Sequence, residues 1–549
     1  MHPLSSFNRT ALMRQMALEE ADLLIIGGGI TGAGIALDAV SRGLKVALVE
    51  KQDFAAGTSS RSTKLIHGGL RYLKQAEFKL VHEVGSERAV IYKNAPHLVV
   101  PEKMLLPLVK NGSYSPTMTS FGLWLYDKLA GVKKEEQRKM LTPEEVLKEE
   151  SLLRKDILIG GGLYVEYRTD DARLTLEILK TAASKGALLL NYMEVHSFLY
   201  EGNQVSGAVV EDELTGKSIS IKAKQIVNAA GPWVDQLRKQ DNSLQGKRLH
   251  LTKGVHIVVP QGRLPVKHSV YFDVPDGRMV FAIPRGKVTY IGTTDTNYQG
   301  SLEDPAVSKA DAEYLLEAAN KMFPSVFLNM HDILSSWAGL RPLIHEDGKS
   351  ASELSRKDEI FISPRGLISI AGGKLTGYRK MAERVTDLVS KNLKSKFNIK
   401  TNPCTTATIT ITGGDFTSPS AVPAYIDELE HKLKAVGLGK AEAEYLVRVY
   451  GTQSDQVYDK IKEEYNGTSG EEAMIRGELW FCIQHEALYH ASDFLLRRTG
   501  RIYFDISSAD RYKEVVLKEM QKALQWNEGQ VGVERLLIEK ALNRSRVFE

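Results

Sequence analysis

The sequence predicts an α/β protein with a helical C-terminal domain, and three observations carry this prediction. Short apolar runs of strand length alternate with helical patterns over residues 21–400. The first such strand passes through a glycine-rich turn, residues 27–32, into a helix. The glycine motifs stop after about residue 400, and residues 421–549 are charged and helical in period. We therefore expect a short helical lead-in at 1–20, an α/β region at 21–400 and a separate helical domain at 401–549.

The first strand, turn and helix have the pattern of a dinucleotide-binding unit. An apolar strand ends in Gly-x-Gly-x-x-Gly, a helix of small residues follows, and the next strand, 46–49, ends in an acid. The first glycine permits the tight turn, the second lets backbone amides approach a pyrophosphate, and the third lets the helix pack closely. The acid, about 20 residues on, is placed to accept hydrogen bonds from a ribose. The residues expected to contact the cofactor here are Gly27, Gly29, Ile30, Thr31, Gly32 and Glu50.

The position and chemistry of this unit discriminate among nucleotide cofactors. A motif so close to the N-terminus favours FAD over NAD. Glu50, rather than an arginine, follows the second strand, which argues against a bound 2′-phosphate and therefore against NADP.

The composition is that of a globular enzyme with room for two or three domains. The chain has 549 residues, of which 43% are hydrophobic and 26% charged. Its net charge of +4 is too balanced to indicate a nucleic-acid partner. The two cysteines, Cys404 and Cys482, form neither a disulfide framework nor a metal cluster, so we expect no metal and a reducing, cytoplasmic location. No apolar run approaches the ~18 residues of a membrane-spanning helix.

The remaining elements follow from periodicity and turn residues. Residues 81–160 read as mainly helical, with a break at 160–162. Residues 192–226 alternate as hairpin strands do. Helices are predicted at 172–185, 308–323 and 378–393, and strands at 187–190, 255–259, 279–283, 289–292, 360–362 and 367–370.

Three further segments are predicted to complete the cofactor site. A strand that ends at 229–231 has the small side chains needed beside a nucleotide, and 370–376 form a second strand–Gly-Gly–helix junction. Hydroxyls and amides at 58–60 suit a ribityl chain and a pyrophosphate. Each segment alone also reads as an ordinary turn or solvated loop, and only their combination indicates a long cofactor. The residues expected to contact it are Thr58, Ser59, Ser60, Lys64, Ala230, Gly231, Gly373, Lys374, Leu375 and Thr376.

Longer motifs are similar to those of a known family. They occupy, in order, segments 22–50, 58–73, 228–233, 253–260, 291–295, 339–343 and 372–380. The most specific read KLIHGGLRYL from Lys64 and GGKLTGYRK from Gly372. In these motifs the chain resembles the flavin-dependent glycerol-3-phosphate dehydrogenases, and the first motif adds Gly69 to the expected cofactor contacts. Beyond residue 400 the resemblance depends on length and helical character.

The resemblance implies a fold like that of D-amino-acid oxidase. Such a fold has an FAD-binding Rossmann-like domain, an antiparallel-sheet substrate domain, here mainly 81–160 and 235–340, and in this chain a helical cap. The resemblance also implies non-covalent FAD, oxidation of sn-glycerol 3-phosphate to dihydroxyacetone phosphate, and electron transfer to a membrane quinone. Oxygen as the acceptor, an amine or amino-acid oxidase on the same fold, and a non-catalytic flavin protein stay open as alternatives.

A phosphorylated substrate requires several fixed positive charges, and the planar fork of arginine suits this task best. Any single arginine is more often part of a structural ion pair or a solvated surface. The residues that the resemblance places around the substrate are Arg71, Tyr72, Arg341, Arg356 and Lys374, with Arg356 in a less well matched loop.

A base must take the hydroxyl proton as hydride leaves carbon two. Histidine is the natural candidate, because nearby arginines lower its pKa and keep it neutral. His256 lies in a matched strand and His67 in a matched loop. A strand histidine between valine and isoleucine is also a common core residue, so Arg341 or a water stays open as the base.

The sequence gives a weaker indication of contact with a membrane. Residues 121–129 are rich in aromatic and apolar side chains and are followed by Lys133, Lys134 and Arg138. Such a helix can lie at a membrane interface on the cytoplasmic face, but a stretch of this kind is more often a buried helix. A peripheral membrane contact is therefore left open, as is a homodimer.

Overall fold

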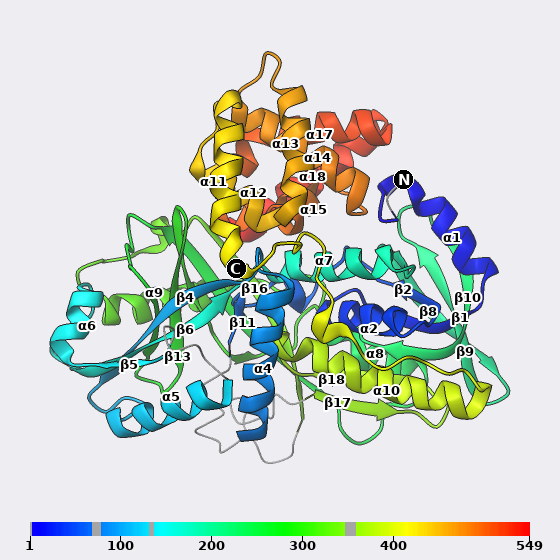
Figure 1. Ribbon diagram of the computed structural model, residues 1–549, viewed down its shortest axis with the longest axis horizontal. Helices are drawn as coiled ribbons and strands as arrows, with labels where there is room; N and C mark the ends of the chain where they lie inside the picture. The colour runs from blue at the N-terminus through cyan, green and yellow to red at the C-terminus, as the bar shows by residue number, and fades with distance from the viewer. Residues whose placement is uncertain (1–2, 68–77, 131–136, 346–357, 549) are drawn as a thin grey trace.

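The computed structural model describes residues 3–67, 78–130, 137–345 and 358–548. Two sheets lie side by side, and the C-terminal helices, yellow to red in Figure 1, form a separate part stacked on both. The lead-in contains helix α1 (Arg9–Leu18), as expected, and the buried Arg9 of this helix pairs with Asp212.

The first sheet has a parallel centre whose carboxyl ends meet at one edge. Its path runs β17 (Asp358–Ile362), β18 (Ile368–Gly372), β10 (Lys217–Asn228), β1 (Ala21–Ile26), β2 (Val46–Val49) and β7 (Leu188–Leu190), with β8 (Met193–Glu201) and β9 (Gln204–Asp212) as an antiparallel extension. β10, β1, β2, β7 and β18 pair in parallel. The predicted segments that follow β1, β2, β10 and β18 therefore lie at one edge of this sheet.

Three helices pack beside one another against this sheet. They are α2 (Ile30–Ser41), α7 (Asp171–Ser184) and α10 (Tyr378–Phe397). A Cβ added to Gly34 of α2 would lie 2.9 Å from the ring of Tyr378 in α10, so the small residues of α2 serve close helix packing. The helices predicted at 172–185 and 378–393 are confirmed as α7 and α10.

The second sheet is mainly antiparallel. Its strands are β3 (Leu65–Ile66), β4 (Val100–Val109), β5 (Lys139–Leu141), β6 (Leu158–Arg168), β11 (Leu249–Pro260), β12 (Ser269–Asp273), β13 (Met279–Arg285), β14 (Val288–Gly292), β15 (Thr296–Asn297) and β16 (Ser335–Ile344). The helices beside it are α4 (Phe78–Asn94), α5 (Pro116–Ala130), α6 (Pro143–Glu149) and α9 (Lys309–Met322). β16 pairs along β11 over ten positions, and this register sets the centre of the substrate region.

The prediction of mainly helical structure for 81–160 is wrong in part. Two prolines, Pro101 and Pro107, argue against a strand, yet both lie in β4. β12 pairs with β4 only at Met104 and Leu105, so both prolines lie where β6 is the partner of β4 in the described structure. A proline is tolerated where a strand has a partner on one side only.

The predicted break at 160–162 is also wrong, because these glycines lie inside β6. A Cβ added to Gly161 would lie 2.6 Å from Val146 in α6, and one added to Gly162 would lie 2.9 Å from Leu123 in α5. The glycines therefore let two helices pack directly on the strand.

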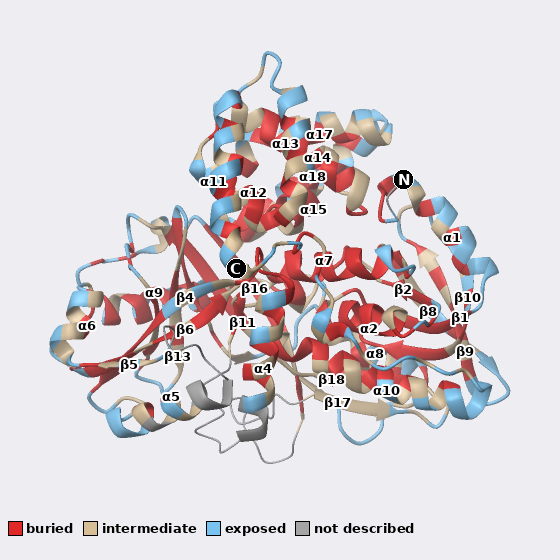
Figure 2. Ribbon diagram, viewed as in Figure 1, coloured by how far each residue is buried: buried red, intermediate tan, exposed pale blue. Residues whose placement is uncertain are grey.

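The C-terminal part is helical, as predicted. Its helices are α11 (Val422–Leu433), α12 (Lys440–Tyr450), α13 (Ser454–Glu464), α14 (Gly470–His485), α15 (Ala491–Asp493), α16 (Arg501–Phe504), α17 (Ile506–Leu524) and α18 (Glu528–Arg546). They enclose a core of their own, and buried residues continue along the boundary with the sheets (Figure 2). Ser335 and Ser336 of β16 donate hydrogen bonds to the carbonyls of Tyr503 and Ser545, which joins the two parts.

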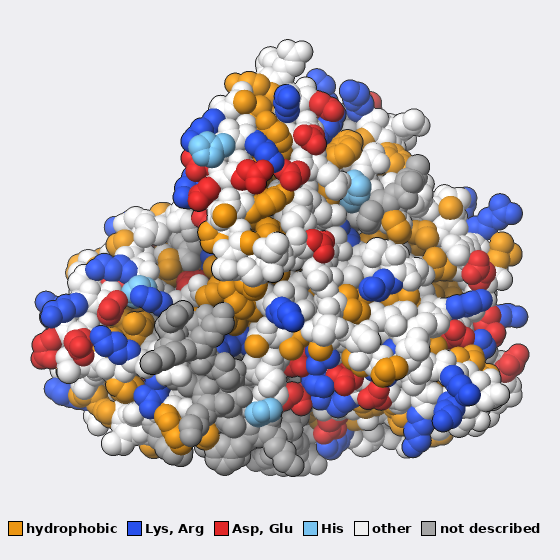
Figure 3. Space-filling model, viewed as in Figure 1, with side chains coloured by type: hydrophobic (Ala, Val, Ile, Leu, Met, Phe, Trp, Pro, Cys, Tyr) orange, Lys and Arg blue, Asp and Glu red, His pale blue; other side chains and the backbone are white. Residues whose placement is uncertain are grey.

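No helix among the described residues combines the length and apolar character that crossing a membrane requires. Positive and negative side chains are interspersed over the face drawn in Figure 3. This distribution matches the near balance of charge in the sequence.

Candidate active site

The predicted cofactor segments surround a cavity of about 520 Å³ at the carboxyl edge of the first sheet. We call it cavity A. The predicted residues that line it are Gly27, Gly29, Ile30, Thr31, Glu50, Thr58, Ser59, Ala230, Gly231, Gly373, Lys374 and Leu375. Segments that lie more than 300 residues apart in the chain therefore form one continuous wall, as a long cofactor requires.

The glycines of the first turn have two different roles. A Cβ on Gly27 would lie 2.5 Å from the Ala229 carbonyl, and one on Gly32 would lie 1.9 Å from the Gly27 carbonyl, so the fold itself excludes side chains there. A Cβ on Gly29 would meet only Ser59, at 3.1 Å, among the described residues. Gly29 therefore leaves open space in cavity A at the start of α2, and the N-terminus of a helix is a favourable place for an anion.

Glu50 is fixed at the end of β2 by the backbone. Its carboxylate accepts hydrogen bonds from the amides of Gly28, at 2.7 Å, and Gln52, at 2.9 Å. Burial raises the pKa of Glu50 and these amides oppose the rise. An ionised carboxylate has about four acceptor positions, so both oxygens keep the capacity to accept ribose hydroxyls in cavity A.

A second cavity, cavity B, has a volume of about 770 Å³ and lies against the second sheet. The residues that line both cavities are Thr58, Ser62, Pro342, Gly373, Lys374 and Leu375. Cavity A therefore adjoins cavity B beside the Gly-Gly–helix junction after β18. Thr376 lines cavity B and donates to the carbonyl of His67, which also lines it.

Arg341 and Lys374 bring positive charge into cavity B. The Arg341 guanidinium donates to Asp295 Oδ1 and to the Thr294 carbonyl, both at 3.0 Å, and to Thr293 Oγ1 at 2.8 Å. These contacts hold the fork in one orientation at the cavity wall. The predictions for Gly69, Arg71, Tyr72 and Arg356 lie outside the described residues.

His256 lies in β11 and is both a core residue and part of the wall of cavity B, so the two interpretations left open by the sequence coexist. Its Nε2 lies 3.0 Å from the Thr63 hydroxyl, and its ring stacks on Trp337 at a centroid distance of 4.7 Å. Burial, and then the charges of Arg341 and Lys64, hold the pKa of His256 well below its usual value. The imidazole is therefore neutral at physiological pH.

Three predicted cofactor residues are absent from the described lining of both cavities: Gly32, Ser60 and Lys64. The buried Lys64 ammonium donates to Asp171 at 2.5 Å and to the Ser60 carbonyl at 3.0 Å. This pair ties the segment after β2 to the start of α7. A direct contact of Lys64 or Ser60 with the cofactor stays a prediction.

Several lining residues were not predicted. Lys51 and Trp233 line cavity A and meet at Glu303, whose carboxylate lies 2.9 Å from each donor nitrogen. Asp171 also lines cavity A and begins α7. An acid directly before a predicted helix is a usable signal for Asp171, whereas the sequence carries no local signal for Glu303.

Comparisons with known proteins agree with this geometry. A family model described as FAD dependent oxidoreductase matches residues 22–379, and one described as the C-terminal domain of alpha-glycerophosphate oxidase matches 404–531. The aerobic glycerol-3-phosphate dehydrogenase of Bacillus subtilis is 51% identical over 96% of this chain and 95% of that protein. That of Staphylococcus aureus strain USA300 is 49% identical over 99% of this chain and 98% of that protein.

Solved structures give the same result. The glycerol-3-phosphate dehydrogenase from Bacillus halodurans complexed with FAD superposes with a TM-score of 0.84, at 45% identity, over 99% of both chains. The L-alpha-glycerophosphate oxidase from Mycoplasma pneumoniae with FAD bound gives a TM-score of 0.56 at 21% identity, over 70% of this chain and 97% of that one. The second likeness concerns the fold alone.

Proposed function

We propose that this chain, which belongs to the FAD-dependent oxidoreductase family, oxidises sn-glycerol 3-phosphate to dihydroxyacetone phosphate and passes the electrons to a membrane quinone. The observation that carries this proposal is the junction of the two cavities. A cavity whose lining suits a dinucleotide adjoins, at Gly373 and Lys374, a second cavity that is lined by Arg341 and a neutral His256.

The residues of cavity A fit FAD. The open space at Gly29 and the start of α2 suit the pyrophosphate, and the fixed carboxylate of Glu50 suits the ribose hydroxyls. Bound there, FAD supplies the acceptor for a hydride. The Gly-Gly–helix junction at 372–376 lies where the two cavities meet, so it would border the flavin ring.

Arg341 and Lys374 are proposed to bind the phosphate of the substrate in cavity B, together with Arg71, Tyr72 and Arg356. Arg341 is held by Asp295 and by two threonines, so it loses little freedom when an anion binds. A fork already oriented favours a bidentate contact with phosphate oxygens. Binding energy from this remote group would then orient carbon two for the reaction.

His256 is proposed to accept the hydroxyl proton. Its neutral form is the one that can act as a base, and the low pKa keeps that form populated. The hydrogen bond to Thr63 and the stack on Trp337 fix the plane of the ring. His67, which also lines cavity B, is the second candidate.

Contact with a membrane is proposed for α5. Met118 and Trp124 of this helix are exposed, at 58% and 42%, and the aromatic stretch 121–129 lies in the same helix; side chains of this kind can insert into a lipid interface. A quinone dissolved in the membrane would then be reached from the cytoplasmic face.

An anaerobic flavin spectrum tests the proposed reaction. Glycerol 3-phosphate should bleach the oxidised flavin, whereas saturating glycerol and D-alanine should leave most of it oxidised. Bleaching by D-alanine alone would contradict the proposal and favour an amino-acid oxidase. Reoxidation of the bleached enzyme by a quinone analogue faster than by dissolved oxygen would support the quinone, and the reverse order would favour a glycerol-3-phosphate oxidase.

A further inference from the structure

One segment, residues 50–64, lines both cavities. Glu50, Lys51 and Gly57 lie on cavity A, Thr58 and Ser62 on both, and Arg61 and Thr63 on cavity B. Apart from a short 3-10 helix at Thr58–Ser60, the segment is turn and loop, so neighbouring parts of the molecule must fix its position. Its anchors are therefore relevant to the flavin.

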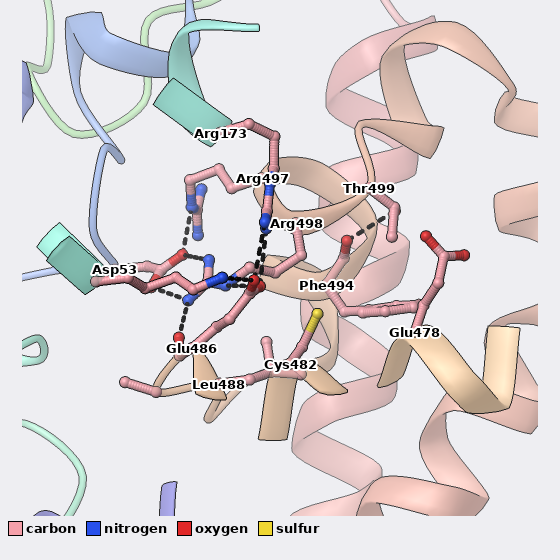
Figure 4. A network of polar contacts seen from close by, with 12 residues as sticks. Asp53, Arg173, Glu478, Cys482, Glu486, Leu488, Phe494, Arg497, Arg498 and Thr499 are labelled. Carbon is pink, nitrogen blue, oxygen red and sulfur yellow. Dashed lines mark hydrogen bonds and ion pairs between the residues drawn. The ribbon is translucent and has the colours of Figure 1, made fainter. Parts of the chain in front are cut away.

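The first anchor is Asp53, which is fully buried and binds the helical C-terminal domain (Figure 4). Arg498 contacts both of its carboxylate oxygens, at 2.6 and 2.9 Å, and Arg497 contacts one of them at 2.7 Å. Burial favours the neutral acid, but the guanidiniums of Arg498 and Arg497 outweigh this and hold the pKa of Asp53 well below its usual range. The segment is therefore clamped by a charged pair of arginines from another domain.

The second anchor reaches the other end of the segment through α7. Asp171, which lines cavity A, accepts hydrogen bonds from the amide and hydroxyl of Ser62 and from Lys64. Two residues further along α7, Arg173 contacts both carboxylate oxygens of Glu486 at 2.8 Å. Glu486 belongs to the helical domain and its carbonyl accepts from Arg498, so both anchors end in one cluster (Figure 4).

The cluster joins the two parts of the molecule through buried charges, and removing these charges from water has a high desolvation cost. Three buried cations, Arg173, Lys180 and Arg498, and the partly exposed Arg497 lie among four buried acids, Asp53, Glu177, Glu486 and Asp493. Buried ion pairs add little net stability compared with well-packed apolar residues, but loss of one partner leaves a costly unpaired charge. Such a cluster therefore fixes geometry more effectively than it increases stability.

We propose that the helical C-terminal domain positions FAD, and that Arg497 and Arg498 are positioning residues that act through Asp53. They hold segment 50–64 so that Glu50 faces the ribose while Thr58 and Ser59 border the rest of cavity A. The inference uses the FAD of the family and not the proposed substrate, so either can fail without the other.

The test compares two arginines of low exposure, Arg497 and Arg501, in the full-length chain. Arg497→Met removes contacts to Asp53 and to Asp493, whereas Arg501→Met removes contacts to Glu478 and Ser508 that lie wholly within the helical domain. The two are well matched, since the exposed fractions of the pairs are 11% and 0% for Arg497–Asp53, and 6% and 0% for Arg501–Glu478. Measurements are the dissociation constant and release rate of FAD, the flavin reduction potential and the melting temperature of the apoprotein.

Arg497→Met should raise the FAD dissociation constant about tenfold or more and shift the potential, while Arg501→Met should change the dissociation constant by less than about twofold at a similar loss of apoprotein stability. Equal changes in both variants would overturn the proposal, because FAD affinity would then follow domain stability alone. Wild-type affinity and potential in Arg497→Met would overturn it as well.

A milder pair keeps the proposal testable if the methionine variants do not fold. Arg497→Lys keeps the charge and loses the fork, so it should weaken FAD binding less than Arg497→Met but more than Arg501→Lys does. Equal FAD dissociation constants for the two lysine variants would overturn the proposal.

Discussion

The two cavities are built from different parts of the chain, although six residues belong to both. Cavity A takes its shape from backbone: glycines at 27–32, amides that hold Glu50, and the turn after β18. Cavity B takes its character from side chains on neighbouring strands, such as Arg341 and His256. Cavity A should therefore be sensitive to added side-chain volume, because backbone forms its wall. Cavity B should be sensitive to a change of charge, because charged side chains give it its character. The variants considered next test this difference, from the largest expected effect to the smallest.

The largest effect is expected in cavity A, from Gly29→Val. The valine side chain would occupy the part of cavity A at the start of α2 where the pyrophosphate should lie. Flavin content should therefore fall close to zero. The apoprotein should stay folded, since a Cβ at this position meets only Ser59 among the described residues. Flavin absorbance per protein and the apoprotein melting temperature measure the two effects.

Gly32→Ala is the matched comparison, since its Cβ would lie 1.9 Å from the Gly27 carbonyl and should disturb folding itself. Full flavin content in Gly29→Val would move the cofactor away from the glycine turn and remove the contrast between the cavities.

Cavity B is tested next, by replacing Arg341. Loss of one charged partner from a desolvated phosphate site costs on the order of 2–5 kcal/mol, so Arg341→Ala should lower kcat/KM for glycerol 3-phosphate by at least about thirtyfold. Arg341→Lys should recover only part of this, because the fork is lost. Flavin content should stay at the wild-type level in both. Unchanged steady-state kinetics in the alanine variant would make Arg341 a structural partner of Asp295.

Gly29 and Arg341 also differ in how far the sequence alone could predict their place in the site. The turn at 27–32 and Glu50 are close in sequence, so their spacing carries the geometry of cavity A. Arg341 meets Asp295 because β16 and β14 both pair with β11, a relation set by strand register rather than by local pattern. The family motifs located Arg341, but composition and periodicity alone could not.

The elements that sequence reasoning missed were determined by distant packing. Pro101 and Pro107 are in β4, which the local pattern disfavours, because β12 is too short to pair beside them. Asp53 and Arg497, which lie 444 residues apart, carry no signal in the sequence that they meet. The sequence predicts that the C-terminal domain is helical, but it does not predict that this domain contacts segment 50–64 through Asp53.

An intermediate effect is expected from competing anions and salt. If Arg341 and Lys374 bind a phosphate, inorganic phosphate should raise the apparent KM for glycerol 3-phosphate without changing kcat. Added sodium chloride should raise KM as well, through partial screening of the half-buried charges. FAD binding should respond less, because backbone amides and glycines dominate cavity A. Initial rates over a phosphate series at constant ionic strength separate the two contributions, and non-competitive inhibition would place the anion outside the substrate site.

The smallest effect concerns acid stability, where His256 is expected to behave as a buried residue as well as a proposed base. Its pKa in the folded chain lies well below the ordinary value, first through burial and then through Arg341 and Lys64. Between that low value and about 6.5, the unfolded chain therefore binds one more proton at this residue than the folded chain does. The free energy of unfolding then falls as pH falls through this window, by up to about 1.4 kcal/mol per pH unit. Buried His97 has a lowered pKa too and should contribute in the same direction.

Urea unfolding of the apoprotein between about pH 5 and 7 should therefore lose part of its pH dependence in His256→Gln, and a similar part in His97→Gln. The two variants should differ in turnover, because His256 lines cavity B and His97 is not among its described lining residues. Full turnover in His256→Gln with a reduced acid slope would make His256 a structural residue and leave His67 as the proposed base. An unchanged slope in His256→Gln would mean that the folded chain takes up the proton as readily as the unfolded one, which is incompatible with a neutral, buried imidazole.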